Sequence, residues 1–105
     1  MGTKKKETAK KVAAKRSVGA LENGRCYFVR GVTMYYTGRL VAHDAQTMVL
    51  ADAAWIADTG RFADALKSGS FAEVEPYPDG VLVRIERSAV LDVSDWAHAL
   101  PRAQK

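Results

Sequence analysis

Apolar residues after position 25 occur in short runs separated by turn-forming residues. Such runs of aliphatic and aromatic side chains, many of them β-branched, are typical of short strands. The runs at 26–29 and 34–36 predict one strand with a bulge or bend at Gly31, and Gly38 predicts a second bend. The residues at 44–46 predict a turn between neighbouring strands. The further strands are predicted at 40–43, 47–50, 81–85 and 89–93.

The apolar spacing changes to that of a helix at 58–68. Phe62, Ala65 and Leu66 recur at i, i+3 and i+4, which places them on one face of a short helix. An N-terminal cap is expected at the first or second residue of this segment, and Gly69 is expected to end the helix.

The remaining segments complete a mainly β chain. Residues 73–75 are expected to be extended, 76–80 to form a turn, and 95–100 to form a last helical turn or two that Ser94 caps. Too few strands are predicted for two packed sheets, so the expected fold is α+β: a small, strongly bent β-barrel with a short inserted helix. The expected divisions are a basic flexible arm at 1–22, a single domain at 23–100 and a tail at 101–105.

The positive charge of the chain is concentrated at its start. The 105 residues carry a net charge of +4, but residues 1–16 hold seven basic side chains and one acidic one, a balance of +6. The other residues hold nine basic and eleven acidic side chains, a balance of −2. This arm either attracts nucleic-acid phosphates by counterion release or is a solvated, disordered tail that aids solubility. Its cationic residues are Lys4, Lys5, Lys6, Lys10, Lys11, Lys15 and Arg16.

Several classes of protein do not fit the sequence. Cys26 is the single cysteine, so it predicts no internal disulfide and no cysteine-rich zinc site. No apolar run is long enough to span a bilayer, and none follows the basic start as in a secretory signal, so a cytoplasmic protein without membrane contact is expected. His43 next to Asp44 predicts a half-buried histidine beside a turn aspartate. We find no catalytic constellation, cofactor motif or metal site, and expect no enzyme.

Two segments resemble the motifs of the Sm and Hfq family of small barrels. Arg87-Ser88-Ala89-Val90 is similar to part of the second motif, although Ser88 stands where Hfq has a histidine. An insertion from about 51 to 80 separates the two motifs. The resemblance implies a ring of identical subunits that binds nucleic acid or small nucleotides through residues 43–46, Arg87 and Ser88. The first motif is matched by Gly38, Leu40, His43, Asp44, Met48, Val49 and Leu50.

Two further groups add candidate ligand contacts. Tyr36 beside Arg39 is a candidate for base stacking combined with charge. Arg84 and Arg87 could form a cationic pocket if a ring repeats them, or could pair with nearby glutamates on the strand surface. The complete set of expected nucleotide-binding residues is Tyr36, Arg39, His43, Asp44, Gln46, Arg84, Arg87 and Ser88.

The predicted function is non-enzymatic binding of nucleic acid or small nucleotides by a homo-oligomer. Two alternatives remain open. The segment around Val29-Arg30 and Ala54-Trp55 resembles small domains of tailed bacteriophages, which implies a counter-defence factor that sequesters a host nucleotide signal. The second alternative is a protein–protein adaptor that binds a host protein through exposed strand edges and the inserted helix.

Overall fold

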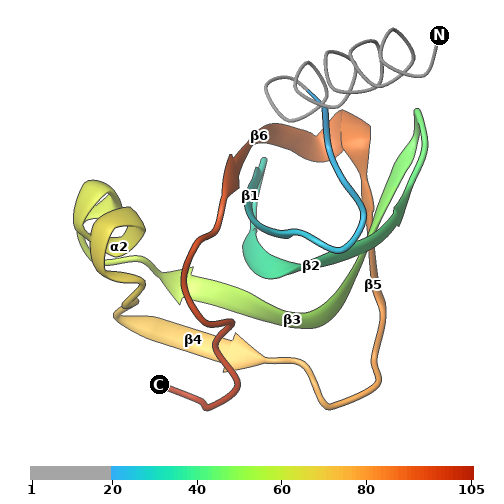
Figure 1. Cartoon of the computed structure of the whole chain (residues 1–105). Helices are drawn as coiled ribbons and strands as arrows, with labels where there is room; N and C mark the ends of the chain where they lie inside the picture. The colour runs from blue at the N-terminus through green and yellow to red at the C-terminus, as the bar shows by residue number, and fades with distance from the viewer. Residues whose placement is uncertain (1–19) are drawn as a thin grey trace, which may run out of the picture.

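The computed structural model describes residues 20–105, so the basic residues of the arm lie outside the described residues. This part of the chain is mainly β with one short helix, α2 (Phe62–Ser68), as expected, and a 3₁₀ turn, η1 (Arg87–Ala89) (Figure 1). The strands are β1 (Cys26–Gly31), β2 (Tyr35–His43), β3 (Thr47–Asp58), β4 (Glu73–Pro76), β5 (Val83–Glu86) and β6 (Val90–Asp95).

The strands form one antiparallel sheet in the order β4-β3-β2-β1-β6. Strand β3 is longer than predicted and has two partners along one edge: its start pairs with β5, and its end pairs with β4. No ladder within residues 20–105 joins β6 to β4 or β5, so the expectation of a closed barrel is wrong. The physical reason is η1, which stands between β5 and β6 where a hairpin turn would have paired them.

The bend expected at Gly38 is confirmed. The register of β2 against β3 shifts between Thr37 and Arg39, and β3 carries an extra residue opposite this point. Asp52, within that part of β3, has a left-handed backbone with φ of 49°. A Cβ atom at Gly38 would lie 2.9 Å from the Cβ of Leu50. Glycine therefore allows the two strands to approach closely where the sheet bends.

The strand predicted through 26–36 is instead a hairpin. Strands β1 and β2 pair antiparallel, from Cys26 opposite Arg39 to Arg30 opposite Tyr35. The N–H of Gly31 donates to the carbonyl of Met34 at 2.8 Å and closes the turn. A Cβ atom at Gly31 would meet that same oxygen at 2.8 Å. Gly31 thus serves a tight turn between two strands, where we had expected a bend within one.

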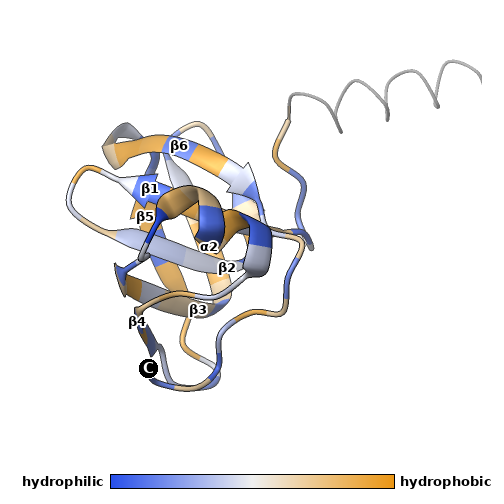
Figure 2. Cartoon of the chain, turned by 90° about the vertical axis from the view of Figure 1, so that its left-hand side faces the viewer, coloured by the Kyte–Doolittle hydropathy of each residue, from blue (hydrophilic) through white to orange (hydrophobic). Residues whose placement is uncertain are grey.

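Both faces of the central strands are buried. One cluster, the inner cluster, contains Tyr27 and Val29 of β1 together with apolar residues of β2, β3 and β5. Phe28 points to the other face and belongs to the outer cluster, which consists of Phe28, Ala54, Ile56, Ala65, Phe71, Val74 and Trp96. Figure 2 shows α2 lying in front of the strands on this face. The ring of Phe28 contacts four other aromatic rings there. Because successive side chains of β1 point to opposite faces, this strand contributes residues to the cores on both faces of the sheet.

The elements around the outer cluster differ from prediction at two points. Gly69 ends α2 with a φ of 75°, as expected, but no side chain caps its start, and Asp58 accepts a hydrogen bond from the N–H of Gly60 instead. The helical turn expected at 95–100 is absent, because β6 continues to Asp95. Beyond it the chain crosses the sheet and pairs Lys105 with Val74 of β4 through two backbone hydrogen bonds of 2.9 Å (Figure 1). No helix in the described part of the chain is long and apolar enough to cross a membrane.

Candidate functional site

The turn between β2 and β3 is ordered by Asp44. One carboxylate oxygen, Oδ1, accepts hydrogen bonds from the N–H groups of Gln46 and Thr47, both at 2.8 Å. These two bonds stabilise the charged carboxylate and lower the pKa of Asp44 below its ordinary value. The N–H of Asp44 in turn donates to the carbonyl of Thr47 at 3.0 Å. The aspartate of the first motif therefore shapes a tight, exposed turn.

Arg87, the first residue of η1, is hydrogen-bonded to this turn. Its backbone N–H donates to the carbonyl of Gln46 at 2.8 Å, and its Nη1 donates to the carbonyl of Asp44 at 2.7 Å. No acidic side chain within residues 20–105 forms an ion pair with Arg87, and Ser88 follows it in η1. The structure thus brings residues 43–46 together with Arg87, which lies about forty residues further along the chain.

The described chain enters the fold beside the same turn. The ring nitrogen Nδ1 of His43 lies 2.9 Å from Oδ1 of Asn23, and the N–H of Gly24 donates to the carbonyl of Leu40 at 2.6 Å. His43 is exposed, where we had expected it to be half-buried, because the end of β2 extends beyond the inner cluster. Its imidazole is bound to Asn23 and shares no hydrogen bond with Asp44.

The other expected ligand residues lie away from the turn. Arg39 binds Asp52 at 2.7 Å, and this hydrogen bond lowers the pKa of the Asp52 carboxyl. Tyr36 packs against the inner cluster and donates its hydroxyl to the sulfur of Met34 at 3.1 Å. Burial, and secondarily the neighbouring Tyr77, raises the pKa of Tyr36. Tyr36 and Arg39 are therefore both engaged within the fold.

Arg84 is the remaining cationic candidate. It is exposed on β5 opposite Val49, within the ladder that also holds Thr47 opposite Glu86. Among residues 20–105 no acidic side chain forms an ion pair with Arg84. Arg84 thus stands on the strand that leads into η1 and Arg87, with its charge not compensated by a described partner.

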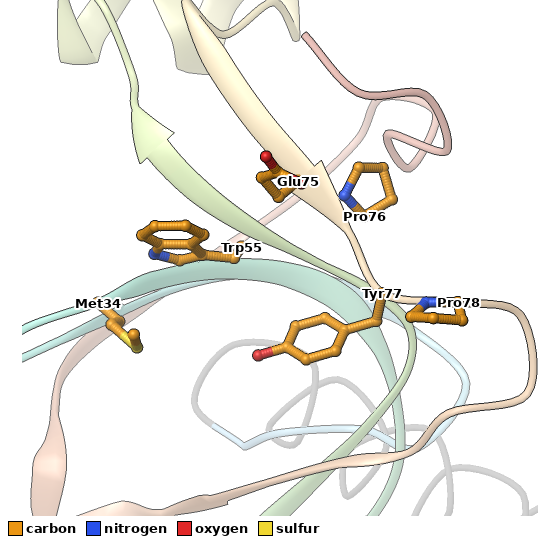
Figure 3. A pocket seen from close by; sticks show the side chains of 6 residues that line it. All are labelled: Met34, Trp55, Glu75, Pro76, Tyr77 and Pro78. Carbon is orange, nitrogen blue, oxygen red and sulfur yellow. The ribbon is translucent and has the colours of Figure 1, made fainter.

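A groove lies at the other end of β3 (Figure 3). Trp55 is opposite Tyr36 of β2 and Glu75 of β4, so these three side chains point to the same face of the sheet. The groove has a volume of about 230 Å³, and Trp55 is 36% exposed in it. Its lining residues are Met34, Trp55, Glu75, Pro76, Tyr77 and Pro78.

This groove was not predicted from the sequence. We had expected Trp55 to anchor the inserted helix or to fill a subunit interface. The cluster beneath α2 contains Ala54 and Ile56 and not Trp55, so the first alternative is wrong, and the second stays a prediction. Alternation along β3 points Trp55 away from the helix. The available signal was the Pro-Tyr-Pro segment at 76–78, which we had taken only as a turn.

The described residues contain no group of three or more histidine, cysteine, aspartate or glutamate side chains that could hold a metal ion. Comparison with protein-family models, with curated proteins and with solved structures found no match to this chain.

Proposed function

We propose that this protein is a non-enzymatic binding protein that takes nucleic acid through the turn surface, which we define as His43, Asp44, Gln46, Arg84, Arg87 and Ser88. The observation that carries the proposal is the double attachment of Arg87 to the carbonyls of Asp44 and Gln46. It holds an arginine in place on an exposed turn. A guanidinium fixed in this way loses little conformational entropy when it binds a phosphate.

The position of the basic arm supports the same site. Asn23 contacts His43 of the turn, and Arg16 is the last cationic residue of the arm, seven positions earlier. Seven extended residues reach at most about 25 Å, so the chain length alone keeps Arg16 within this distance of Asn23. Seven basic side chains joined to Arg84 and Arg87 form a combination suited to a polyanionic chain.

Self-assembly belongs to this proposal, as the Sm and Hfq resemblance implies. Strand β6 pairs with β1 alone and β5 with β3 alone within residues 20–105, so each has an edge without a ladder partner there. Pairing of β5 in one copy with β6 in the next would cover both edges. It would also repeat η1 and Arg87 around the assembly. Native mass spectrometry tests this step, and a bare monomer at micromolar concentration contradicts it.

The ligand is tested by fluorescence anisotropy with a labelled single-stranded RNA, titrated over a range of salt concentrations. Each phosphate contact on a single strand contributes about 0.7 to the slope of log affinity against log salt. Removal of residues 1–16 is therefore expected to reduce the slope by up to about 5. Arg84→Ala and Arg87→Ala are each expected to reduce it by about 0.7.

Arg61→Ala is the matched control, because Arg61 precedes α2 and forms no ion pair within residues 20–105. Its slope should equal that of the unchanged protein. Circular dichroism of each variant separates a lost contact from a lost fold. Equal affinity and slope for the Arg84, Arg87 and Arg61 variants contradict the turn surface as the site.

The same titration distinguishes a factor that sequesters a small nucleotide. Such a factor binds its ligand equally well without residues 1–16, because one or two phosphates do not engage a long cationic arm. Binding of a dinucleotide that survives truncation and is lost in Arg87→Ala would favour this alternative over nucleic acid.

A further inference from the structure

We propose that the groove around Trp55 binds a short proline-rich segment of a partner protein in the polyproline II conformation, with a basic side chain of that segment placed against Glu75. This adds a protein-binding site to the proposed nucleic-acid surface and does not depend on it. The groove lies where β3 pairs with β4, and the turn surface lies where β3 begins and pairs with β5.

The walls of the groove are aromatic and apolar. Figure 3 shows open space between the rings of Trp55 and Tyr77, with Met34 to the left, Pro76 beside Glu75 above Tyr77, and Pro78 to the right of Tyr77. Its volume of about 230 Å³ is below the range of roughly 300–1,000 Å³ that is usual for small-molecule sites. Aromatic-lined grooves of this kind take proline-rich segments, whose rings fill shallow slots without further loss of backbone entropy.

A free hydrogen-bond donor completes the match. A polyproline II segment has no internal hydrogen bonds, so its carbonyl oxygens are available to a partner. No acceptor within residues 20–105 pairs with the indole N–H of Trp55, whereas the indole N–H of Trp96 donates to the carbonyl of Ala99 at 3.2 Å. Trp55 therefore presents both a stacking surface and an unused donor.

The groove is held in shape before any ligand binds. The N–H of Tyr77 donates to the carbonyl of Ala53 at 2.9 Å, and Nη2 of Arg102 donates to the carbonyl of Tyr77 at 2.9 Å. Arg102 also binds Asp79 at 2.7 Å. The backbone of Tyr77 is thus held through both its N–H and its carbonyl, which reduces the entropic cost of binding.

Charge selects the class of ligand. Glu75 is the charged residue in the groove lining, and one of its oxygens accepts a hydrogen bond from Gln104 at 2.9 Å. No basic side chain in residues 20–105 forms an ion pair with Glu75. Arg39 and Arg102 are occupied by aspartates. A phosphate would meet repulsion here, whereas an arginine or lysine beside the prolines would meet an available carboxylate.

The test uses the full chain and a synthetic peptide of about ten residues that is proline-rich and ends in one arginine. Two matched peptides replace the arginine by glutamate or the prolines by alanine. The chain has two tryptophans, so two-dimensional NMR resolves their indole N–H signals. The proline–arginine peptide should shift the Trp55 signal and leave that of buried Trp96 in place, with the glutamate and alanine peptides at least ~10-fold weaker.

Two variants test the assigned contacts. Trp55→Phe keeps an aromatic ring but removes the indole donor, and fluorescence anisotropy of a labelled peptide should show affinity reduced about 3- to 10-fold. Glu75→Gln should bring the arginine and glutamate peptides to similar affinities. Lys67→Ala is the control, since Lys67 is exposed on α2, which packs against the other face of the sheet, and its affinity should be unchanged.

Three results overturn the proposal. The first is that the proline–arginine peptide leaves the Trp55 signal unmoved. The second is equal binding of the alanine peptide, which removes the polyproline conformation as the recognised feature. The third is a stronger response of Trp55 to RNA than to the peptide, which places nucleic acid in the groove. Removal of residues 1–16 should leave peptide binding unchanged, so the two sites can fail separately.

Discussion

Replacing Gly38 by alanine tests whether close approach of β2 and β3 shapes the sheet. The added Cβ would lie 2.9 Å from the Cβ and 3.1 Å from the Cδ1 of fully buried Leu50. Rotation of the Leu50 side chain can move Cδ1 but not Cβ, so the two strands must separate by several tenths of an ångström. Overpacking of this kind costs about 1–3 kcal/mol. Loss of the flexible glycine from the unfolded chain offsets about 0.4–1 kcal/mol, and the midpoints of the two ranges leave a net loss of about 1.3 kcal/mol.

The assay is urea unfolding followed by circular dichroism, with all variants at one protein concentration because assembly alters apparent stability. A loss of 1 kcal/mol lowers Tm by roughly 4–8 °C in a domain of this size. Ala42→Gly, an exposed position on the same strand, measures the backbone contribution alone. If Gly38→Ala is as stable as the unchanged protein after this correction, the close contact with Leu50 does not constrain the bend and the reasoning is refuted.

Three further predictions concern the cores and the titratable groups. Phe28→Ala should cost about 3–5 kcal/mol in urea unfolding, because Phe28 is 1% exposed among four rings, while Val32→Ala, at an exposed turn, should stay within about 0.5 kcal/mol. The pKa of Asp44 is lowered on folding, so its carboxylate stabilises the fold above about pH 4 and ceases to do so as pH falls. Asp44→Asn should therefore be less stable at pH 7 and should approach the unchanged protein in acid, and a constant gap would contradict this. Burial raises the pKa of the Cys26 thiol, so iodoacetamide at pH 8 should alkylate it more slowly in the folded protein than in urea, and equal rates would refute the assignment.

Local sequence signals predicted the elements whose structure is fixed by neighbouring residues. Gly69 ends the helix, Gly38 lies at the bend, and residues 73–75 are extended, because turn and cap chemistry acts over a few positions. Strand pairing between residues that are far apart in the sequence could not be predicted from such signals. Strand β3 continues to Asp58 through the left-handed residue Asp52, and beyond it pairs with β2 on one edge and with β4 on the other.

The candidate site likewise has features that local sequence predicts and features that depend on residues far apart in the chain. The turn at 43–46 follows from Asp44 and its own backbone, and the motif resemblance placed Arg87 nearby. The ion pair of Arg39 with Asp52 depends on the extra residue in β3, which the sequence does not reveal. The groove around Trp55 depends on the register of β3 with β2 and β4. The sequence shows the tryptophan itself but does not predict which side chains lie beside it.

Asp52 separates the two halves of β3 and with them the two proposed binding surfaces. Residues 47–50 pair with β5 and lead back to the turn surface, while residues 54–58 pair with β4 and form one wall of the groove. Along one edge each half is bonded to a different strand, while β2 pairs with both halves along the other edge, and the ion pair with Arg39 joins the bend to β2. The turn surface and the groove have no residue in common. We therefore predict that a polyanion and a peptide bind at the same time, with affinities that are additive in free energy.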